Sequence, residues 1–302
     1  MSTTSTGQEL KIAFSTGTAV SRDGTRIGYR QLGQGPGVVL LHGSMESAAN
    51  HMQLAAGLAD AFTVYLPDRR GRGTSGPYGD SYGIHREVED LAAVLTQTGA
   101  RHVFGVSASG LVVLQAALTL QGIDRAAVYE PALLLDGFDP RLTGWLTRFD
   151  QEIAAGNTAG ALVTSMLGLR LGPAILNVMP RWLLESVTNM AMKSEDKKAA
   201  PDDVTMRKLA PTVGYEGQLI AEMAGTLESF RAVKAEVLLL GGSKGLEFLK
   251  PGLGALERVL PHASRVEFDG LDHGGSSDVT KANAGGKPER VVPELRRFFG
   301  AA

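Results

Sequence analysis

One serine in the first half of the chain has the surroundings that a nucleophile needs. Ser107 lies in the run GVSASG (residues 105–110), between a short apolar segment and a stretch with helical patterning. A sharp strand-to-helix turn strains the residue at its apex, and small residues are needed two positions to either side, where backbone approaches backbone. Gly105 and Ser109 meet that need for Ser107, whereas Leu111 would crowd Ser109 in the same role. We therefore expect Ser107 to be the nucleophile.

Two histidines follow Ser107 and could serve as its base. A serine hydroxyl is a weak nucleophile at neutral pH until a base takes its proton. His262 precedes a predicted strand and is expected at the surface. His273 follows the last predicted strand, on the side of the sheet where Ser107 lies. His273 is therefore the predicted base.

The elements that must position these residues alternate between strands and helices. Continuous apolar runs indicate strands buried on both sides, and segments of helical periodicity separate them. The predicted strands cover residues 25–32, 37–41, 62–66, 103–106, 125–129, 236–240 and 264–268. The predicted helices cover residues 48–61, 82–98, 108–120, 246–260 and 289–299. This order predicts a mostly parallel, doubly wound α/β sheet covered by helices on both faces.

The alternation stops between two late strands. Residues 137–233 have helical patterning without a convincing strand, which predicts a helical cap inserted into a core formed by residues 1–136 and 234–302. The cap contains Trp145 and Trp182 and also six methionines: Met166, Met179, Met190, Met192, Met206 and Met223. Methionine adapts to irregular apolar gaps, so most of these side chains are expected to pack between helices. Those that line a cleft, with Trp182 and Met179 as examples, would set acyl-chain preference.

Four segments in register resemble the α/β-hydrolase family. They are HGS at 42–44, DRRGRGTS at 68–75, the serine run at 105–110 and GLDH at 270–273, and each follows a predicted strand. The resemblance extends from about residue 25 to residue 299 and implies an α/β-hydrolase sheet with a Ser–acid–His triad. It also implies a structural role for His42. An oxyanion hole would use the backbone N–H groups of Ala108 and Ser44, with Met45 as the alternative to Ser44.

The acid of the triad departs from the commonest family pattern. In that pattern the acid follows the strand predicted at 236–240, but here GGSKG (residues 241–245) follows and Glu247 is the first carboxylate. In the haloalkane-dehalogenase branch the acid ends the strand after the nucleophile helix, and Glu130 has that place here. Glu130 is the predicted acid, with Asp136 and Glu247 as alternatives. Glu247 also suits the start of a helix, where a carboxylate interacts favourably with the helix dipole.

These residues predict a serine hydrolase that cleaves an uncharged, fairly hydrophobic carboxylic ester or lactone through an acyl-enzyme. Haloalkane dehalogenases and epoxide hydrolases of this fold use an aspartate where Ser107 stands, which disfavours their reactions. Three alternatives remain: a cofactor-free haloperoxidase, a carbon–carbon bond hydrolase, and a non-catalytic receptor for a small molecule.

The composition excludes several other kinds of chemistry. The chain has no cysteine, so disulfides and thiol nucleophiles are excluded, and its six histidines form no recognisable metal motif. GRGTSG at 71–76 matches a dinucleotide fingerprint, but PYGD follows it instead of a helix, so we interpret it as a structural turn. No cofactor or metal is expected.

The charge and the N-terminus bear on partners and location. A net charge of −2 gives no electrostatic reason to expect nucleic acid or a membrane surface as a partner. No apolar core of a signal peptide and no run of about 18 apolar residues occurs, so a cytoplasmic location is expected. The expected partner is a small-molecule ester or lactone, and the sequence does not indicate an oligomeric state.

Overall fold

One eight-stranded sheet forms the centre of the computed structural model, which describes residues 12–200 and 203–300. The strands are β1 (Ser15–Val20), β2 (Arg26–Leu32), β3 (Gly37–Leu41), β4 (Thr63–Pro67), β5 (His102–Val106), β6 (Arg125–Tyr129), β7 (Glu236–Gly242) and β8 (Ala263–Phe268). Their order is β1-β2-β4-β3-β5-β6-β7-β8. The pairs β1–β2 and β2–β4 are antiparallel, and every pair from β4 to β8 is parallel. The prediction of a mostly parallel sheet is confirmed.

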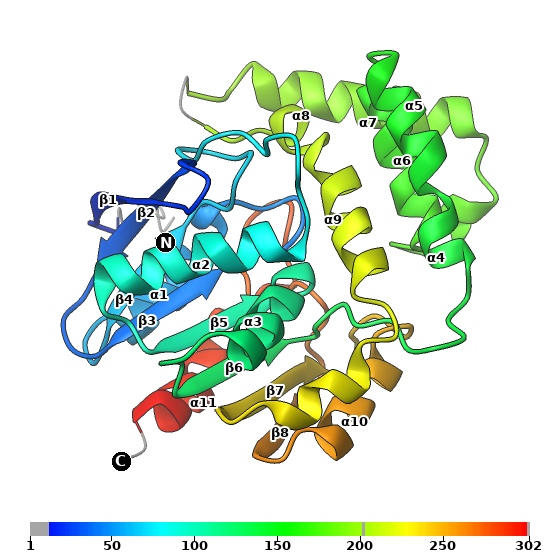
Figure 1. Ribbon diagram of the computed structural model, residues 1–302. Coiled ribbons are helices and arrows are strands. Elements are labelled where there is room, and N and C mark those ends of the chain that lie inside the picture. Colours follow the sequence, from blue (N-terminus) through cyan, green and yellow to red (C-terminus); the bar gives the residue numbers. More distant parts are fainter. Residues whose placement is uncertain (1–11, 201–202, 301–302) are drawn as a thin grey trace, which may run out of the picture.

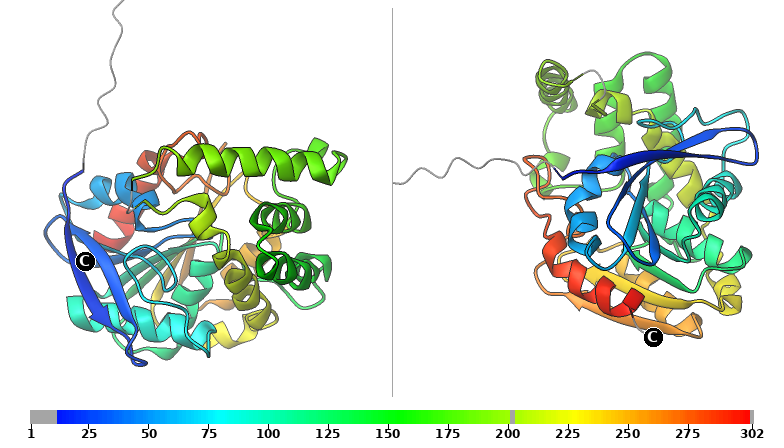
Figure 2. Two further views of the ribbon diagram at one scale, coloured as in Figure 1. Left: turned by 90° about the horizontal axis from the view of Figure 1, so that it is seen from above. Right: turned by 90° about the vertical axis from the view of Figure 1, so that its left-hand side faces the viewer.

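Helices cover both faces of this sheet (Figures 1 and 2). They are η1 (Ala48–His51), α1 (Met52–Leu58), α2 (Ile84–Thr98), α3 (Ala108–Thr119), α10 (Lys250–Val259) and α11 (Pro288–Gly300). One apolar cluster joins the sheet to α2, α3 and α10, and a second cluster on the opposite face joins it to α1 and α11. The doubly wound arrangement follows from strands that are apolar on both sides and must be covered twice.

A helical segment between β6 and β7 lies to one side of the sheet (Figure 1). Its elements are α4 (Arg141–Gly144), α5 (Leu146–Ala154), α6 (Thr158–Gly168), η2 (Ala174–Asn177), α7 (Arg181–Asp196), α8 (Met206–Leu209), α9 (Thr212–Glu222) and η3 (Leu227–Ala232). The described residues of this segment contain no strand. Its last part returns to the sheet, because Leu219, Met223 and Phe230 belong to the same apolar cluster as α2 and α3. The division of the chain into a core and a cap stays a prediction.

Two differences from the sequence prediction concern the edge of the sheet and the candidate site. Strand β1 was not predicted, because its sequence STGTAV is largely polar and only one of its six residues is buried. Helix α10 begins at Lys250 and not at residue 246. Residues 246–249 instead form a turn, and the backbone N–H of Leu246 donates to the carboxylate of Glu130 at 3.4 Å. That contact belongs to the candidate site.

The parallel strands end together at one edge of the sheet. The segments that follow β3, β5, β6 and β8 carry Ser44, Ser107, Glu130 and His273. Because carboxyl ends of parallel strands share one edge, residues far apart in the sequence gather there.

Candidate active site

Ser107 occupies the turn between β5 and α3, in a backbone conformation that side chains rarely adopt. Its φ is 56° and its ψ is −121°. Such strain costs about 1–3 kcal/mol and persists only where surrounding bonds enforce it. The Ser107 N–H donates to the Tyr129 carbonyl at 3.0 Å, and its own carbonyl accepts from Gly110 and Ala132. The turn therefore holds the serine rigidly, with its side chain partly exposed.

The neighbours of Ser107 explain how the turn closes. A Cβ at Gly105 would lie 2.5 Å from the Ser109 carbonyl oxygen, and one at Gly110 would lie 2.8 Å from the Pro131 Cβ. Ser109 is fully buried and its hydroxyl donates to the His42 carbonyl at 2.5 Å. The Ser109 side chain therefore makes a structural contact and is shielded from solvent. This agrees with the prediction that Ser107, and not Ser109, is the nucleophile.

His273 and Glu130 meet directly. The Nδ1 of His273 lies 2.6 Å from Oε2 of Glu130. The imidazole is partly exposed, at 28%, while the carboxylate side chain is 5% exposed. Tyr129 supports the same loop, because its hydroxyl donates to the Asp272 carbonyl at 2.7 Å. His273 and Ser107 line one cavity. A serine hydroxyl, an imidazole and a carboxylate are therefore brought to the same edge of the sheet.

Glycines at the end of β7 and in the loop after it make the space that the Glu130 carboxylate occupies. The N–H of Gly242 donates to Oε1 of Glu130 at 3.0 Å. A Cβ at Gly245 would lie 1.7 Å from that same oxygen. Glu130 also has a left-handed φ of 43°, which turns the chain at the strand end. The GGSKG run lacks a carboxylate of its own, and its glycines equally indicate room for a carboxylate from another strand.

The alternative acids and the second histidine lie elsewhere. The Glu247 side chain is 86% exposed and pairs with Lys250 at 2.6 Å. Asp136 is exposed in the loop after β6, and His262 is exposed before β8. The structure brings neither alternative carboxylate to His273. The catalytic role of Glu130 itself stays a prediction that this geometry favours.

Replacing Gly245 by alanine is expected to lower kcat by about 100-fold while leaving the fold intact. The three atoms nearest to the new methyl group would all belong to the end of the Glu130 side chain, which can move away at little cost to stability. That end holds His273, and a displacement of about 1 Å in such a group costs about 10²-fold in rate. The comparison is Gly254→Ala in α10, where a Cβ would meet only two arginine side chains at 3.8 Å. Equal kcat values for the two variants, with equal thermal stability, would contradict the assignment of Glu130.

His42 connects the loops that follow β3 and β4. Its Nε2 accepts the backbone N–H of Arg69 at 3.1 Å, so its proton lies on Nδ1, 3.0 Å from the Gly43 carbonyl. Burial, together with the charges of Arg72 and Arg69, holds the pKa of His42 well below its usual range. A neutral, fully bonded imidazole fits the structural role that was predicted for His42.

The predicted oxyanion donors flank Ser107. Ala108 is the first residue of α3, where a backbone N–H has no partner within the helix. Ser44 and Met45 form the turn after His42-Gly43, and both line the cavity that contains Ser107. In the described part of the chain, neither of their N–H groups donates a hydrogen bond. Met45 has a left-handed φ of 56°, so the turn is tight.

Glu46 was not singled out by the sequence analysis, yet it joins two loops of the site. Its carboxylate accepts from the Gly43 N–H at 2.7 Å, from the Ser277 hydroxyl at 2.5 Å and from His51 at 3.0 Å. Burial by itself would raise the pKa of Glu46, but His51 and these donors hold it below its usual range. Glu46 thus ties the turn after β3 to the loop that carries His273. No sequence motif marks it.

The cavity above Ser107 is small and mostly apolar. Its volume is about 230 Å³, below the ~300 Å³ at which typical ligand sites begin. Apolar residues form most of its wall: Met45, Val106, Trp145, Leu169, Leu171, Val213, Ile220 and Leu246. Trp182 is 70% exposed, so the expectation that it lines the site is wrong. The lining from the helical segment comes from Trp145 and aliphatic residues, and none of its described methionines contributes.

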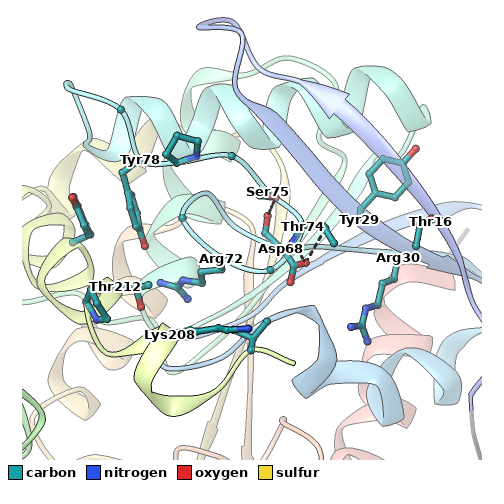
Figure 3. Close-up of a pocket in the computed structure, with 18 of the residues that line it drawn as sticks. Thr16, Tyr29, Arg30, Asp68, Arg72, Thr74, Ser75, Tyr78, Lys208 and Thr212 are labelled. Atoms are coloured by element: carbon teal, nitrogen blue, oxygen red, sulfur yellow. Dashed lines mark hydrogen bonds between the residues drawn. The ribbon is translucent and has the colours of Figure 1, made fainter. Parts of the chain in front are cut away.

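A larger cleft lies on the other side of α9. Its volume is about 1100 Å³, and the residues around it come from β1, β2, the loop after β4, α8 and α9. Figure 3 shows Arg72 reaching from the loop of Asp68 and Thr74 toward Thr212, below the Tyr78 ring. The next helix after this loop is α2, which begins at Ile84, so residues 71–76 are not followed directly by the helix that a dinucleotide site needs.

Among the residues that the structure describes, no group of three or more His, Asp and Glu side chains is arranged to hold a metal ion. In the same residues, no helix combines the length and the hydropathy that a membrane span needs.

The class of this protein follows from its sheet, the turn at Ser107 and the His273–Glu130 pair. Comparison with known proteins supports the same class. The family model described as "Alpha/beta hydrolase family" matches residues 38–282. The chain belongs to the alpha/beta hydrolase family. A crystal structure of an alpha/beta hydrolase from Sphaerobacter thermophilus shares 28% identity at a TM-score of 0.74, covering 94% of this chain and 100% of that one.

Two curated relatives differ in the reactions that their names state. A cis-3-alkyl-4-alkyloxetan-2-one decarboxylase from Shewanella oneidensis is 24% identical over 93% of this chain and 87% of its own length. A pimeloyl-[acyl-carrier protein] methyl ester esterase from Aeromonas hydrophila is 35% identical over 31% of this chain and 36% of its own length. Membership of the family therefore does not specify which reaction this protein catalyses.

Proposed function

We propose that this protein is a serine hydrolase that cleaves a small, uncharged carboxylic ester or lactone through an acyl-enzyme. The observation that carries the proposal is the 2.6 Å contact between His273 Nδ1 and Glu130, together with the cavity that His273 and Ser107 both line. A carboxylate in that position fixes the imidazole so that Nε2 is free to take a proton. The strained turn at Ser107 supports the same conclusion, because Ser107 itself lines the cavity.

The reaction proceeds in two halves. Ser107 attacks the carbonyl carbon while its proton passes to Nε2 of His273, and Glu130 stabilises the imidazolium. The backbone N–H groups of Ala108 and Ser44 stabilise the oxyanion. His273 then returns the proton to the alkoxide. The alcohol of an ester departs at this point, whereas the new hydroxyl of an opened lactone stays on the acyl group. A water molecule, activated by the same imidazole, releases the acid and restores Ser107.

The cavity supports a substrate that is short and without negative charge. Its volume of about 230 Å³ leaves little room for a long chain. Its wall is mostly apolar, and the carboxylates of Glu46 and Glu216 also line it. Arg69 and Arg72 are paired with Glu216, and no lysine or arginine of the described residues lines the cavity, so an anionic substrate group would find no cationic partner there. The aliphatic wall instead favours burial of an alkyl chain.

A series of p-nitrophenyl esters from acetate to octanoate is expected to show the highest kcat/KM at a short acyl chain. Leu171→Ala enlarges the cavity and should raise the octanoate-to-acetate ratio of kcat/KM by at least about tenfold, since one methylene group changes discrimination by ~10–200-fold. Trp182→Ala is the matched control, because that side chain is 70% exposed. A shift in Trp182→Ala without one in Leu171→Ala would show that the cavity around Ser107 is not where the acyl chain binds.

A β-lactone distinguishes the proposed hydrolysis from the reaction named for the Shewanella relative. An oxetan-2-one is a four-membered cyclic ester, and that relative is named a decarboxylase. Hydrolysis by this protein would convert a small alkyl oxetan-2-one into a β-hydroxy acid. Release of carbon dioxide and an alkene, with no turnover of p-nitrophenyl acetate, would overturn the proposal.

A further inference from the structure

We infer that Arg72 is a positioning residue for the oxyanion hole, acting through the peptide bond between Gly43 and Ser44. This inference rests on the proposed function, because it concerns the same acyl transfer. The guanidinium is 3% exposed. Its Nη1 donates to the Gly43 carbonyl at 3.0 Å and to the Glu46 carbonyl at 3.2 Å. One nitrogen thus holds the turn at the two residues that bracket Ser44 and Met45.

The planarity of the peptide bond converts this contact into an orientation of the Ser44 N–H. In a trans peptide the carbonyl and the N–H point in opposite directions. The Gly43 carbonyl points to Arg72, which lines the larger cleft, whereas Ser44 lines the cavity of Ser107. The Ser44 N–H is therefore directed away from Arg72, toward the side where the oxyanion forms. The Met45 N–H belongs to the next peptide, whose carbonyl Arg72 does not hold.

The same contact strengthens the donor. The Gly43 carbonyl accepts from His42 Nδ1 at 3.0 Å as well as from Arg72 Nη1. Two donors on a carbonyl polarise its peptide group, and hydrogen bonds in series strengthen one another in a low-dielectric site. One of these donors is a full positive charge. The Ser44 N–H thus carries more positive charge than an ordinary amide at the moment when the substrate oxygen becomes negative.

Helix α9 keeps Arg72 in place. Its Nη2 donates to Oε1 of Glu216, which also accepts from Arg69 Nη1 at 2.7 Å. Glu216 is 2% exposed and lines the Ser107 cavity from the helical segment. A planar fork with several donors can bind a carboxylate and two carbonyls together, whereas a lysine offers a single nitrogen. The geometry therefore requires arginine at residue 72.

The test compares Arg72→Lys with Arg70→Lys. Arg70 lies in the same loop, is fully buried, and binds Asp90 at 2.6 Å and the Tyr78 carbonyl at 3.0 Å, away from the turn after β3. For p-nitrophenyl acetate, Arg72→Lys should lower kcat by about 10–100-fold with KM within about threefold, since one oxyanion donor accounts for ~10²–10³ in kcat. Arg70→Lys should keep kcat within about threefold. Inhibition by butylboronic acid, which forms a tetrahedral adduct with the serine, should weaken in Arg72→Lys in proportion to kcat/KM.

Amide NMR of the unmodified protein provides a measurement that does not depend on a variant folding. On addition of butylboronic acid, the Ser44 amide proton should shift downfield more than that of Met45. A larger shift at Met45, equal kcat losses in the two lysine variants, or a raised KM with unchanged kcat in Arg72→Lys would each overturn the inference. If the parent protein itself hydrolysed no ester, that result would contradict the proposed function and not specifically the role of Arg72.

Discussion

Ser107→Ala should lower kcat for p-nitrophenyl acetate by about 10⁶-fold, the loss that follows removal of the nucleophile from a serine triad. The rest of the site remains, because the turn is held by backbone bonds from Tyr129, Gly110 and Ala132 that alanine retains. Thermal unfolding should therefore change little. A fluorophosphonate, followed by peptide mass spectrometry, should label Ser107 in the parent protein and nothing in the variant.

Ser109→Ala provides the control for this experiment. The Ser109 hydroxyl is buried and bonded to the His42 carbonyl, so this variant should lose some stability and still accept the label. Labelling of Ser109 in the parent protein, or more than a trace of activity in Ser107→Ala, would falsify the assignment of the nucleophile.

Glu130→Gln should lower kcat by about 10⁴-fold, as expected when a triad acid becomes its amide. The carboxylate accepts the Nδ1–H of His273 at 2.6 Å and the Gly242 N–H at 3.0 Å. A glutamine side chain has one oxygen with which to replace these two acceptor positions. Its NH₂ group must then face either a backbone N–H or the imidazole N–H. The tautomer that leaves Nε2 free for the Ser107 proton is thereby lost.

Glu247→Gln and Asp136→Asn are the matched amide controls, and both should keep kcat within about tenfold of the parent. Glu247 pairs with Lys250 at the surface, and Asp136 is exposed. A crippled Glu247→Gln protein beside a nearly normal Glu130→Gln protein would move the acid to the loop after β7 and refute our assignment.

The positions of the site residues along the sheet were predictable, because strand ends can be recognised in the sequence. Apolar runs place Ser107 after β5, Glu130 after β6 and His273 after β8, and the structure confirms these strands. The contact between Glu130 and His273 was harder to predict from the sequence. It depends on glycines in the next loop, because the absence of side chains there leaves the space that the Glu130 carboxylate fills.

Arg72 could not have been singled out from the sequence. It stands in DRRGRG beside Arg69 and Arg70, and all three arginines are buried and paired in the structure. What distinguishes Arg72 is its pair of carbonyl acceptors and a partner, Glu216, that lies 144 residues further along the chain. Long-range pairing of this kind leaves no local pattern. The expectation for Trp182 was wrong for a related reason. Helical periodicity does not show which face of a helix is covered by another segment.

The glycines after β7 have a consequence for how such a site can change during evolution. The Glu130 carboxylate fills the volume into which a side chain at Gly245 would project. A carboxylate after β6 and a side chain in the loop after β7 therefore compete for one position beside the imidazole. The acid can therefore enter this space from the end of β6 or from the loop after β7, but not from both. Moving the acid from one strand to the other would require at least two linked substitutions, one that vacates the space and one that fills it. A chain that acquired only one of them would hold either two colliding side chains or an imidazole without a carboxylate.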